Sequence, residues 1–327
     1  MDLQTWPNIF LQANAPGLGI CMQIISLLGL PEFYLVIIPM ILWCYDKTLG
    51  LRLLILISVC AAFNVMLKLL FHAPRPYWIS PEVKAFASEP SFGMPSAAAQ
   101  VSLTFFGYIG TWFKKTWVWI TCITLIFLVA IARMYLGVHF LADILTGWLF
   151  ALIVLLLFLR YEKPVAAWGL QKPIGVRILL ALCASGLVIL LSQLVLFSYG
   201  TWQVPADWFA LAYAQTNVSI TPLSLRDVLM TAGILFGALA GAIISAEYIS
   251  YRVDGTISKK AIRYLIGIVV LGCIWIALST LTKSPYLEGS VMTYLRAVLA
   301  GLWVTAGAPF LFCKIGLLRK SEDSCEK

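Results

Sequence analysis

The sequence predicts an all-α integral membrane protein, a polytopic helical bundle that crosses the bilayer about nine times. Three observations support this fold class: 61% of the 327 residues are hydrophobic, only 12% are charged, and the mean hydropathy is +0.92. Soluble globular proteins carry about 25% charged residues and fewer apolar ones. The apolar residues also form blocks of about 15 to 28 residues, which is the length that a membrane-spanning helix needs. A soluble domain and a disordered chain are therefore both excluded.

Apolar blocks and the Gly, Pro and charged residues at their boundaries place the expected helices along the chain. The expected spans are residues 31–45, 50–71, 96–113, 116–135, 138–160, 176–198, 226–246, 262–282 and 290–317. Residues 17–29 give only about 20 Å of helix and lie between two prolines, so we expect a half-helix or an interfacial piece there. We therefore divide the chain into an N-terminal segment 1–30, core helices 31–160, and additional C-terminal helices with a tail, 161–327.

Lys and Arg residues in the connections are unevenly distributed between the two sides of this layout. One side collects sixteen of them: Lys47, Arg52, Lys114, Lys115, Arg160, Lys163, Lys172, Arg177, Arg252, Lys259, Lys260, Arg263, Lys314, Arg319, Lys320 and Lys327. The other side has only Lys84, Arg226 and Lys283. Cytosolic connections are enriched in Lys and Arg, so we expect a cytosolic C-terminus and an outside N-terminus. This distribution explains the net charge of +8 as a topology signal and not as a nucleic-acid-binding surface.

Polar residues gather in three clusters at the expected outer ends of helices, where charges are costly and usually functional. The clusters are Lys68 with Arg75-Pro76, then Pro95-Ser96-Ala97-Ala98, and then Arg133 with His139 and Asp143. Lys68 and Arg75 are about two helical turns apart and can face one patch. Arg133 can add bidentate hydrogen bonds to a phosphate, and Ser96 opens a helix whose free amides favour an anion.

His139 and Asp143 are spaced i and i+4 on one expected helix face. The carboxylate can therefore hold one ring nitrogen and leave the other available for attack on a phosphorus atom. A purely structural pairing of Arg133 with Asp143 would leave His139 and the first cluster unexplained. The three clusters together predict a phosphate-handling site.

The three clusters resemble the motifs of the type-2 phosphatidic acid phosphatase superfamily, which includes membrane lipid phosphatases and glucose-6-phosphatase. The family pattern is Lys, six residues, Arg-Pro; then Pro-Ser-Gly-His; then Ser-Arg, five residues, His, three residues, Asp. Here the first motif is complete, and the third lacks only its Ser, which is Ala132. The resemblance covers about residues 31–160, and the nine-span layout is similar to the glucose-6-phosphatase branch and its bacterial relatives.

The resemblance implies a role for each matching residue. His139 would be the nucleophile that forms a phosphohistidine, with Asp143 orienting it. The phosphate would be held by Lys68, Arg75, Ser96, Ala97 and Arg133. Family members need no metal or other cofactor, and the outside acidic residues show no ligand-like clustering. The implied location is the inner membrane of a bacterium, or the endoplasmic reticulum of a eukaryote.

The second motif departs from the family, because Ala97-Ala98 replaces Gly-His. The missing His is the expected general acid, whose contribution is on the order of 10² to 10⁴ in rate. Ala98 cannot donate a proton, so we expect an impaired chain, inactivated by a deliberate substitution; a natural pseudoenzyme is the alternative. Ala97 is the milder change, since a small residue still permits close approach of the substrate.

Two classes of function remain open at this point. The first is a phosphoric ester or diphosphate hydrolase that acts on a phosphate presented at the outer leaflet. The expected substrate is a lipid phosphate such as phosphatidate, phosphatidylglycerol phosphate or an isoprenyl diphosphate, and the alternative is a sugar phosphate. The second class is a non-catalytic protein that binds or moves phospholipid, in which Ala98 is natural. The oligomeric state has no signal in the sequence.

Three further polar residues have two interpretations each. His72 is either a plain interfacial histidine or a substitute acid, and Asn64 either supports Lys68 or bonds another helix. Arg296 either extends toward the outer surface or faces the bundle and helps to bind a headgroup.

Overall fold

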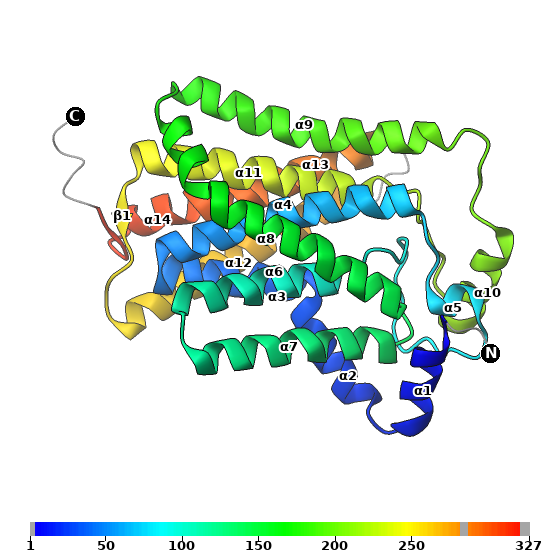
Figure 1. Cartoon of the computed structure of the whole chain (residues 1–327). Helices are drawn as coiled ribbons and strands as arrows, with labels where there is room; N and C mark the ends of the chain where they lie inside the picture. The colour runs from blue at the N-terminus through cyan, green and yellow to red at the C-terminus, as the bar shows by residue number, and fades with distance from the viewer. Residues whose placement is uncertain (1–3, 282–286, 321–327) are drawn as a thin grey trace. The chain divides into compact units, whose positions relative to one another are not determined.

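The computed structural model describes residues 4–281 and 287–320, most of them in helices (Figure 1). Lys283 and Lys327, which contribute to the charge distribution, lie outside these residues. The α-helices are α1 (Trp6–Asn14), α2 (Gly19–Ser26), α3 (Pro31–Met40), α4 (Lys47–Phe71), α5 (Pro76–Ile79), α6 (Ala97–Phe113), α7 (Thr116–Tyr135), α8 (Leu141–Leu170), α9 (Ile174–Ser198), α10 (Ala206–Thr216), α11 (Arg226–Tyr248), α12 (Ile257–Leu281), α13 (Leu287–Leu302) and α14 (Ala308–Lys314). Tighter or wider helical turns are η1 (Leu27–Gly29), η2 (Ile41–Tyr45) and η3 (Trp303–Gly307). The strands described, β1 (Tyr251–Arg252) and β2 (Arg319–Lys320), form one short antiparallel pair.

Seven helical segments in the described part of the chain are long and apolar enough to cross a membrane. They are Lys47–Ile79, Thr116–Tyr135, Leu141–Leu170, Ile174–Ser198, Arg226–Tyr248, Ile257–Leu278 and Ser290–Lys314. A further candidate is the broken pair Gly19–Gly29 and Pro31–Tyr45. Helix α6 has 17 residues, about the minimum spanning length. The predicted all-α polytopic bundle is therefore confirmed.

Three expected spans differ from the helices observed. The first, residues 31–45, is α-helical only over α3 and continues as the π-helical turn η2. Helix α8 starts at Leu141 and continues through Pro164 to Leu170, whereas the sequence predicts residues 138–160. The extra turns contain Glu162 and Lys163, which are good helix formers. The expected span 290–317 is not one regular helix. It widens into the π-helical turn η3 just before Pro309, whose ring lacks a backbone N–H.

The described residues divide into two compact units. Unit 1 comprises residues 4–33, 63–159 and 191–224. In unit 1, α6 packs along α7, both α1 and α2 lie against α7, and the short α5 packs against α10 (Figure 1). All three polar clusters of the sequence fall in unit 1.

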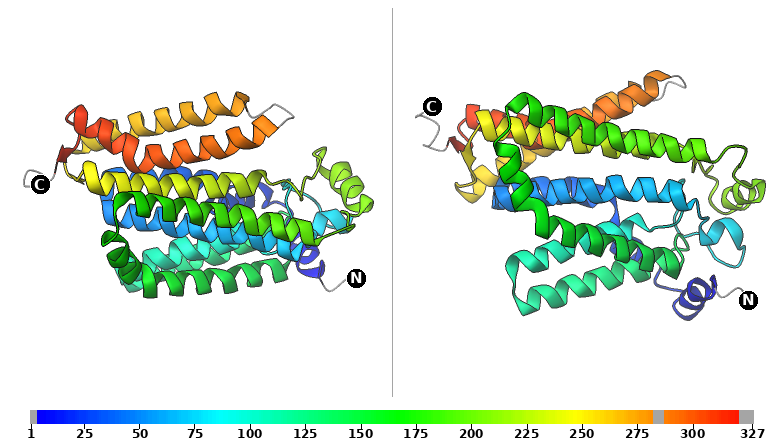
Figure 2. Two further views of the ribbon diagram at one scale, coloured as in Figure 1. Left: turned by 90° about the horizontal axis from the view of Figure 1, so that it is seen from above. Right: turned by 45° about the horizontal axis from the view of Figure 1, so that its top comes forward.

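Unit 2 comprises residues 34–62, 160–190, 225–281 and 287–320. Helix α11 packs along α13, and α12 also contacts α13 (Figure 2). Glycines let these helices approach closely, since a Cβ on Gly237 would overlap the backbone of Val298. The core is centred on Trp43, whose ring meets Phe312 edge-on at 5.6 Å and whose Nε1 donates to the Val304 carbonyl at 2.8 Å.

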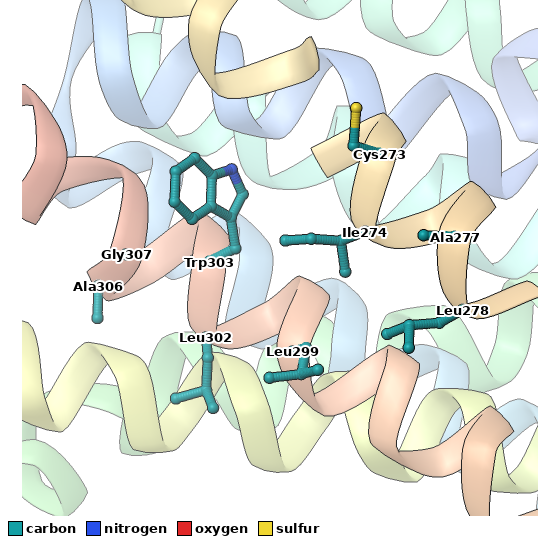
Figure 3. Close-up of a pocket in the computed structure, with 9 residues that line it drawn as sticks. All are labelled: Cys273, Ile274, Ala277, Leu278, Leu299, Leu302, Trp303, Ala306 and Gly307. Carbon is teal, nitrogen blue, oxygen red and sulfur yellow. The ribbon is translucent and has the colours of Figure 1, made fainter. Parts of the chain in front are cut away.

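An apolar groove of about 600 Å³ opens between α12 and the α13–η3 segment of unit 2 (Figure 3). Its lining residues are Cys273, Ile274, Ala277, Leu278, Leu299, Leu302, Trp303, Ala306 and Gly307. None of these lining side chains carries a charge, so the groove offers packing surface and no acid–base chemistry.

Candidate active site

The six polar residues of the three clusters come from different helix ends and lie in unit 1. Lys68 is in the last turn of α4, and Arg133 is in the last turn of α7. Arg75 and Ser96 precede α5 and α6 as their N-cap residues, and Asp143 is in the first turn of α8. His139 lies in the turn between α7 and α8. All six side chains are buried: at most 8% of any of them is exposed, and Arg75 is fully buried.

His139 and Asp143 form a directly contacting pair. The Nδ1 atom of His139 lies 3.2 Å from Oδ2 of Asp143, and the same oxygen accepts a hydrogen bond from the Phe140 N–H at 2.9 Å. On the other edge of the ring, Nε2 lies 3.3 Å from Nη1 of Arg75. An arginine N–H can only donate, which assigns the acceptor lone pair to Nε2 and leaves Nδ1–H to donate to the carboxylate.

The protonation state of His139 is set by its surroundings. Burial and the positive charges of Arg75, Arg133 and Lys68 lower the pKa of His139 well below its ordinary value of 6.5. The imidazole is therefore neutral at neutral pH. Only the neutral ring has a free lone pair on nitrogen, so this environment keeps one ring nitrogen of His139 unprotonated.

Arg75 is held rigidly by the backbone of two loops. Its Nε and Nη2 donate to the carbonyls of Ser91 and Phe92 at 2.6 and 3.0 Å, and its Nη1 donates to the Val138 carbonyl at 2.9 Å. The Ser91 hydroxyl accepts a hydrogen bond from Lys68 at 2.9 Å and also from Nη2 of Arg75 at 3.3 Å. The loop before α6 thus fixes both cations of the first cluster.

Arg133 has an acidic partner that the sequence analysis did not select. Its Nη2 donates to Oε1 of Glu89 at 2.5 Å, and its Nη1 donates to the Ser26 hydroxyl at 3.1 Å. Burial alone would raise the pKa of Glu89, but the charges of Arg133, Arg75 and Lys68 outweigh it and lower the pKa to about 2. Glu89 is therefore ionised at every physiological pH.

The second motif is tied to the third by its backbone. The Ser96 N–H donates to the Asp143 carbonyl at 3.0 Å, and the Ser96 hydroxyl caps α6 by accepting from the Ala99 N–H at 3.4 Å. Asn64 donates to the Pro95 carbonyl at 3.2 Å, so it supports this loop. Asn64 also donates to Oε1 of Gln100 in α6 at 2.8 Å, so of its two expected roles the structure shows the hydrogen bond to another helix.

Position 98, where the second motif of the family has its His, is closely packed. Ala98 is 3% exposed, and a Cβ built on Gly29 would lie 2.7 Å from the Ala98 Cβ. Ala97 beside it is half-buried at the start of α6. The structure thus places Ala98 against η1.

The two other residues with open interpretations contact aromatic rings. The ring of His72 lies edge-on to Tyr199 and Trp202 at 5.1 and 5.0 Å, in an aromatic group. Arg296 belongs to unit 2, is only 2% exposed and stacks over Trp275 at 4.5 Å. It faces the interior of its helix group, and outward extension is not observed.

Two structural residues at the site were not found by sequence reasoning. A Cβ at Gly93 would lie 2.6 Å from the Pro74 carbonyl oxygen and 3.1 Å from Oδ2 of Asp143, so only glycine permits this close approach. Asn8 of α1 donates to the carbonyls of Met134 and His139 at 2.8 and 2.9 Å. Neither residue belongs to a motif, and an isolated Gly or Asn carries no spacing signal.

The fold and this cluster define an integral membrane protein of helical type with a buried site suited to phosphate chemistry. Two family models match the chain: the PAP2 superfamily over residues 49–165, and the PAP2 superfamily phosphatase, transmembrane extension, over residues 229–321. The matches together cover well over half of the sequence, and the first includes all three clusters. The chain belongs to the PAP2 superfamily of membrane phosphatases, as the motifs predict. Searches of curated proteins and of solved structures gave no match.

Proposed function

We propose that this chain is a phosphatase scaffold in which His139 accepts the phosphoryl group of a phosphate monoester or diphosphate. The observation that carries the proposal is the contact between the buried His139–Asp143 pair and the cations beside it. Buried charged groups converging on a neutral imidazole are typical of a functional site.

The reaction consists of two displacements at phosphorus. The Nε2 lone pair of His139 forms an N–P bond while the P–O bond to the leaving group breaks and its electron pair stays on the leaving oxygen. Water then attacks phosphorus, the N–P bond breaks, and the electron pair returns to Nε2 with release of inorganic phosphate. The Asp143 carboxylate stabilises the positive charge that develops on the ring in the first step.

Three cations are available for the charge on the phosphate. Nε of Arg133 is buried and has no hydrogen-bond partner within the described residues, so an N–H donor remains available for a phosphate oxygen. Arg75 and Lys68 are fixed beside it by Ser91. Charge-assisted hydrogen bonds to a phosphate are roughly twice as strong as neutral ones.

The absence of an acid at position 98 affects the first displacement. An alkoxide leaving group is strongly basic and needs a proton, whereas the phosphate released from a diphosphate does not. We expect Ala98 to impair monoester hydrolysis most, by about 10² to 10⁴. The residue at position 98 therefore determines which substrates this chain can still hydrolyse.

The proposed substrate is a lipid phosphate or isoprenyl diphosphate in the outer leaflet. Support comes from the membrane-spanning helices of the chain and from the sixteen Lys and Arg residues expected at the opposite helix ends, a distribution typical of the cytosolic side. A sugar phosphate remains the alternative because of the number of spans.

A second candidate function has an observation of its own in its favour. Ala98 packs closely beside Gly29, so this site fits alanine as it stands. A protein that binds a phosphorylated lipid without hydrolysing it would retain the cations and need no acid at position 98.

The experiment compares phosphate release from a lipid monophosphate, its diphosphate and nitrophenyl phosphate. The proteins are the present chain, Ala98→His, and His139→Ala. We expect Ala98→His to accelerate the monophosphate most, and His139→Ala to abolish release from all three substrates. Retained diphosphate hydrolysis in His139→Ala would rule out the covalent role. No release from any substrate, even with Ala98→His, would favour the binding protein.

A further inference from the structure

Glu89 places a carboxylate among the cations that are expected to hold phosphate. Its Oε1 accepts from Arg133 at 2.5 Å, and its Oε2 lies 4.0 Å from Nη2 of Arg75. The charge of Lys68 also acts on it. This carboxylate therefore contacts the same N–H donors that the oxygens of a bound phosphate would contact.

Hydrogen bonds to the backbone of Glu89 and of the next residue fix the position of this loop. The Tyr77 hydroxyl is bonded to both the N–H and the carbonyl of Glu89, each at 3.0 Å. The next residue, Pro90, accepts a hydrogen bond from the Thr221 N–H at 3.0 Å. Glu89 is therefore presented to the cations by a fixed backbone.

Glu89 is also the most accessible charged side chain of the cluster. A quarter of its side chain is exposed, whereas Arg133 is 4% exposed and Arg75 is fully buried. An anion that comes from solvent or from a membrane surface therefore meets Glu89 before it meets the guanidinium groups.

Charge balance argues against a phosphate dianion binding beside an ionised Glu89. The three cations exceed the carboxylates of Glu89 and Asp143 by one positive charge. Adding a dianion would make the buried cluster negative, which is unfavourable at low dielectric. If the Glu89 carboxylate leaves or takes up a proton, the same dianion makes the cluster neutral.

We propose that Glu89 is a built-in ligand of the phosphate subsite, which an incoming phosphate dianion displaces from Arg133. This inference rests on the proposed function, because it takes Lys68, Arg75 and Arg133 as the phosphate-binding groups. After hydrolysis the carboxylate returns to Arg133 and competes with inorganic phosphate, which favours product release.

Displacement links anion binding to proton uptake. In the anion-free state the cations hold the pKa of Glu89 at about 2. A bound dianion neutralises Arg133, Arg75 and Lys68, so the pKa of Glu89 rises toward or above its ordinary value. Anion affinity should therefore increase as the pH falls through that raised pKa, with up to about one proton bound per anion.

Sulfate is the suitable probe because it is a tetrahedral dianion that does not titrate above pH 3. Calorimetric titration of the detergent-solubilised chain gives its affinity between pH 4 and 8. The variants are Glu89→Gln, the shorter carboxylate Glu89→Asp, and Arg133→Ala. The matched control is Glu82→Gln, an exposed residue of the same loop with the same change of charge. His139 and Asp143 remain in every variant, so their titration cancels in the comparison.

We expect Glu89→Gln to bind sulfate at least about tenfold more tightly. The ionised carboxylate opposes the anion, and each unit by which anion binding raises the pKa of Glu89 corresponds to a factor of ten in affinity. Its affinity should also increase less toward acid pH than that of the parent, Glu89→Asp and Glu82→Gln, because protonation of His139 and Asp143 contributes equally in all of these proteins. Equal or weaker binding by Glu89→Gln, with binding weakened in Arg133→Ala, would overturn the role of Glu89 and leave the phosphate subsite intact. Undiminished binding by Arg133→Ala would overturn the subsite itself.

A purely structural role of Glu89 makes the opposite prediction. Glu89→Gln would then lower the melting temperature without tightening sulfate binding. In our proposal it lowers the melting temperature only without sulfate, because the added anion replaces the lost carboxylate and restores the stability.

Discussion

Buried arginines occur in both units, but their surroundings differ. In unit 1, Arg133 contacts the carboxylate of Glu89, and Arg75 contacts the imidazole of His139. In unit 2, the fully buried Arg263 donates to the backbone carbonyls of Trp43, Asp254 and Lys259. Arg296 stacks on an indole ring.

This difference indicates which buried arginines belong to an anion-binding site and which do not. Backbone carbonyls and an indole ring cannot leave or change charge, so we expect Arg263 and Arg296 to have structural roles. A carboxylate and an imidazole can move or exchange a proton, so the unit 1 arginines can take a new anion. The partners of an arginine are therefore more informative than its burial.

Replacing one arginine in each unit tests this contrast most strongly. Arg133→Ala should weaken vanadate or phosphate binding about ten- to hundredfold, because one charge-assisted hydrogen bond contributes about 1.5 to 3 kcal/mol. Arg296→Ala should leave anion binding unchanged and lower only the melting temperature, through lost packing. Titration calorimetry and thermal melts in detergent measure both effects, and equal losses of binding would contradict the contrast.

A pair of glycines tests the packing of the two units. Gly93→Ala should destabilise the protein by about 1 to 3 kcal/mol and weaken anion binding, because the new methyl group meets the Pro74 carbonyl and Asp143. Gly186→Ala, in α9, has open space and should be neutral or stabilising by about 0.5 to 1 kcal/mol. If Gly93→Ala retains both properties, the close approach at the site is not required.

The acid limb of the pH–rate profile tests the neutral state of His139. Burial and the neighbouring cations lower its pKa, and in the proposed mechanism the neutral ring is the nucleophile. Hydrolysis of nitrophenyl phosphate should therefore stay constant as the pH falls from 8 to 6.5 and decrease only at a well lower pH. Lys68→Gln removes one of those charges and should move the decrease to higher pH. An acid limb that Lys68→Gln leaves at the same pH would mean that the cations do not act on His139.

Labelling of single cysteines determines which helix ends of unit 1 face the outside of the cell, and so on which side of the membrane its arginines can meet an anion. Lys84→Cys lies in the loop that carries Glu89, and Lys115→Cys lies between α6 and α7. Both side chains are exposed, and the background would lack other cysteines. An impermeant thiol reagent added to intact cells should modify position 84 and not position 115. The reverse pattern would place the site on the cytosolic side.

Much of the fold could be predicted because long apolar blocks leave few alternatives to helices. The boundaries of α7 and the end of α9 agree with the expected spans, since Lys114, Lys115 and Gly200 end the apolar blocks clearly. The extension of α8 beyond residue 160 could not be predicted, because a charged helix outside the bilayer and a charged loop have the same composition. The π-helical turn η3 also has no signal in an apolar block.

The candidate site was predictable only as far as its residues follow helical spacing. His139 and Asp143 are one turn apart, so their contact follows from helix geometry. Glu89 lies in an irregular loop, and its contact with Arg133 depends on how that loop folds back across 44 residues of sequence. Without periodicity, an acidic residue in a loop looks like any other solvated charge.

The two hydrogen bonds of Asn8 also impose an order on biosynthesis. Asn8 leaves the ribosome first, but its acceptors lie 126 and 131 residues later in the chain. At about 5 to 20 residues per second, α1 waits roughly 6 to 26 seconds before the turn that carries His139 exists. The first helix made therefore reaches its final partners only after the third polar cluster has been synthesised, and the backbone of His139 acquires this support only when the two meet.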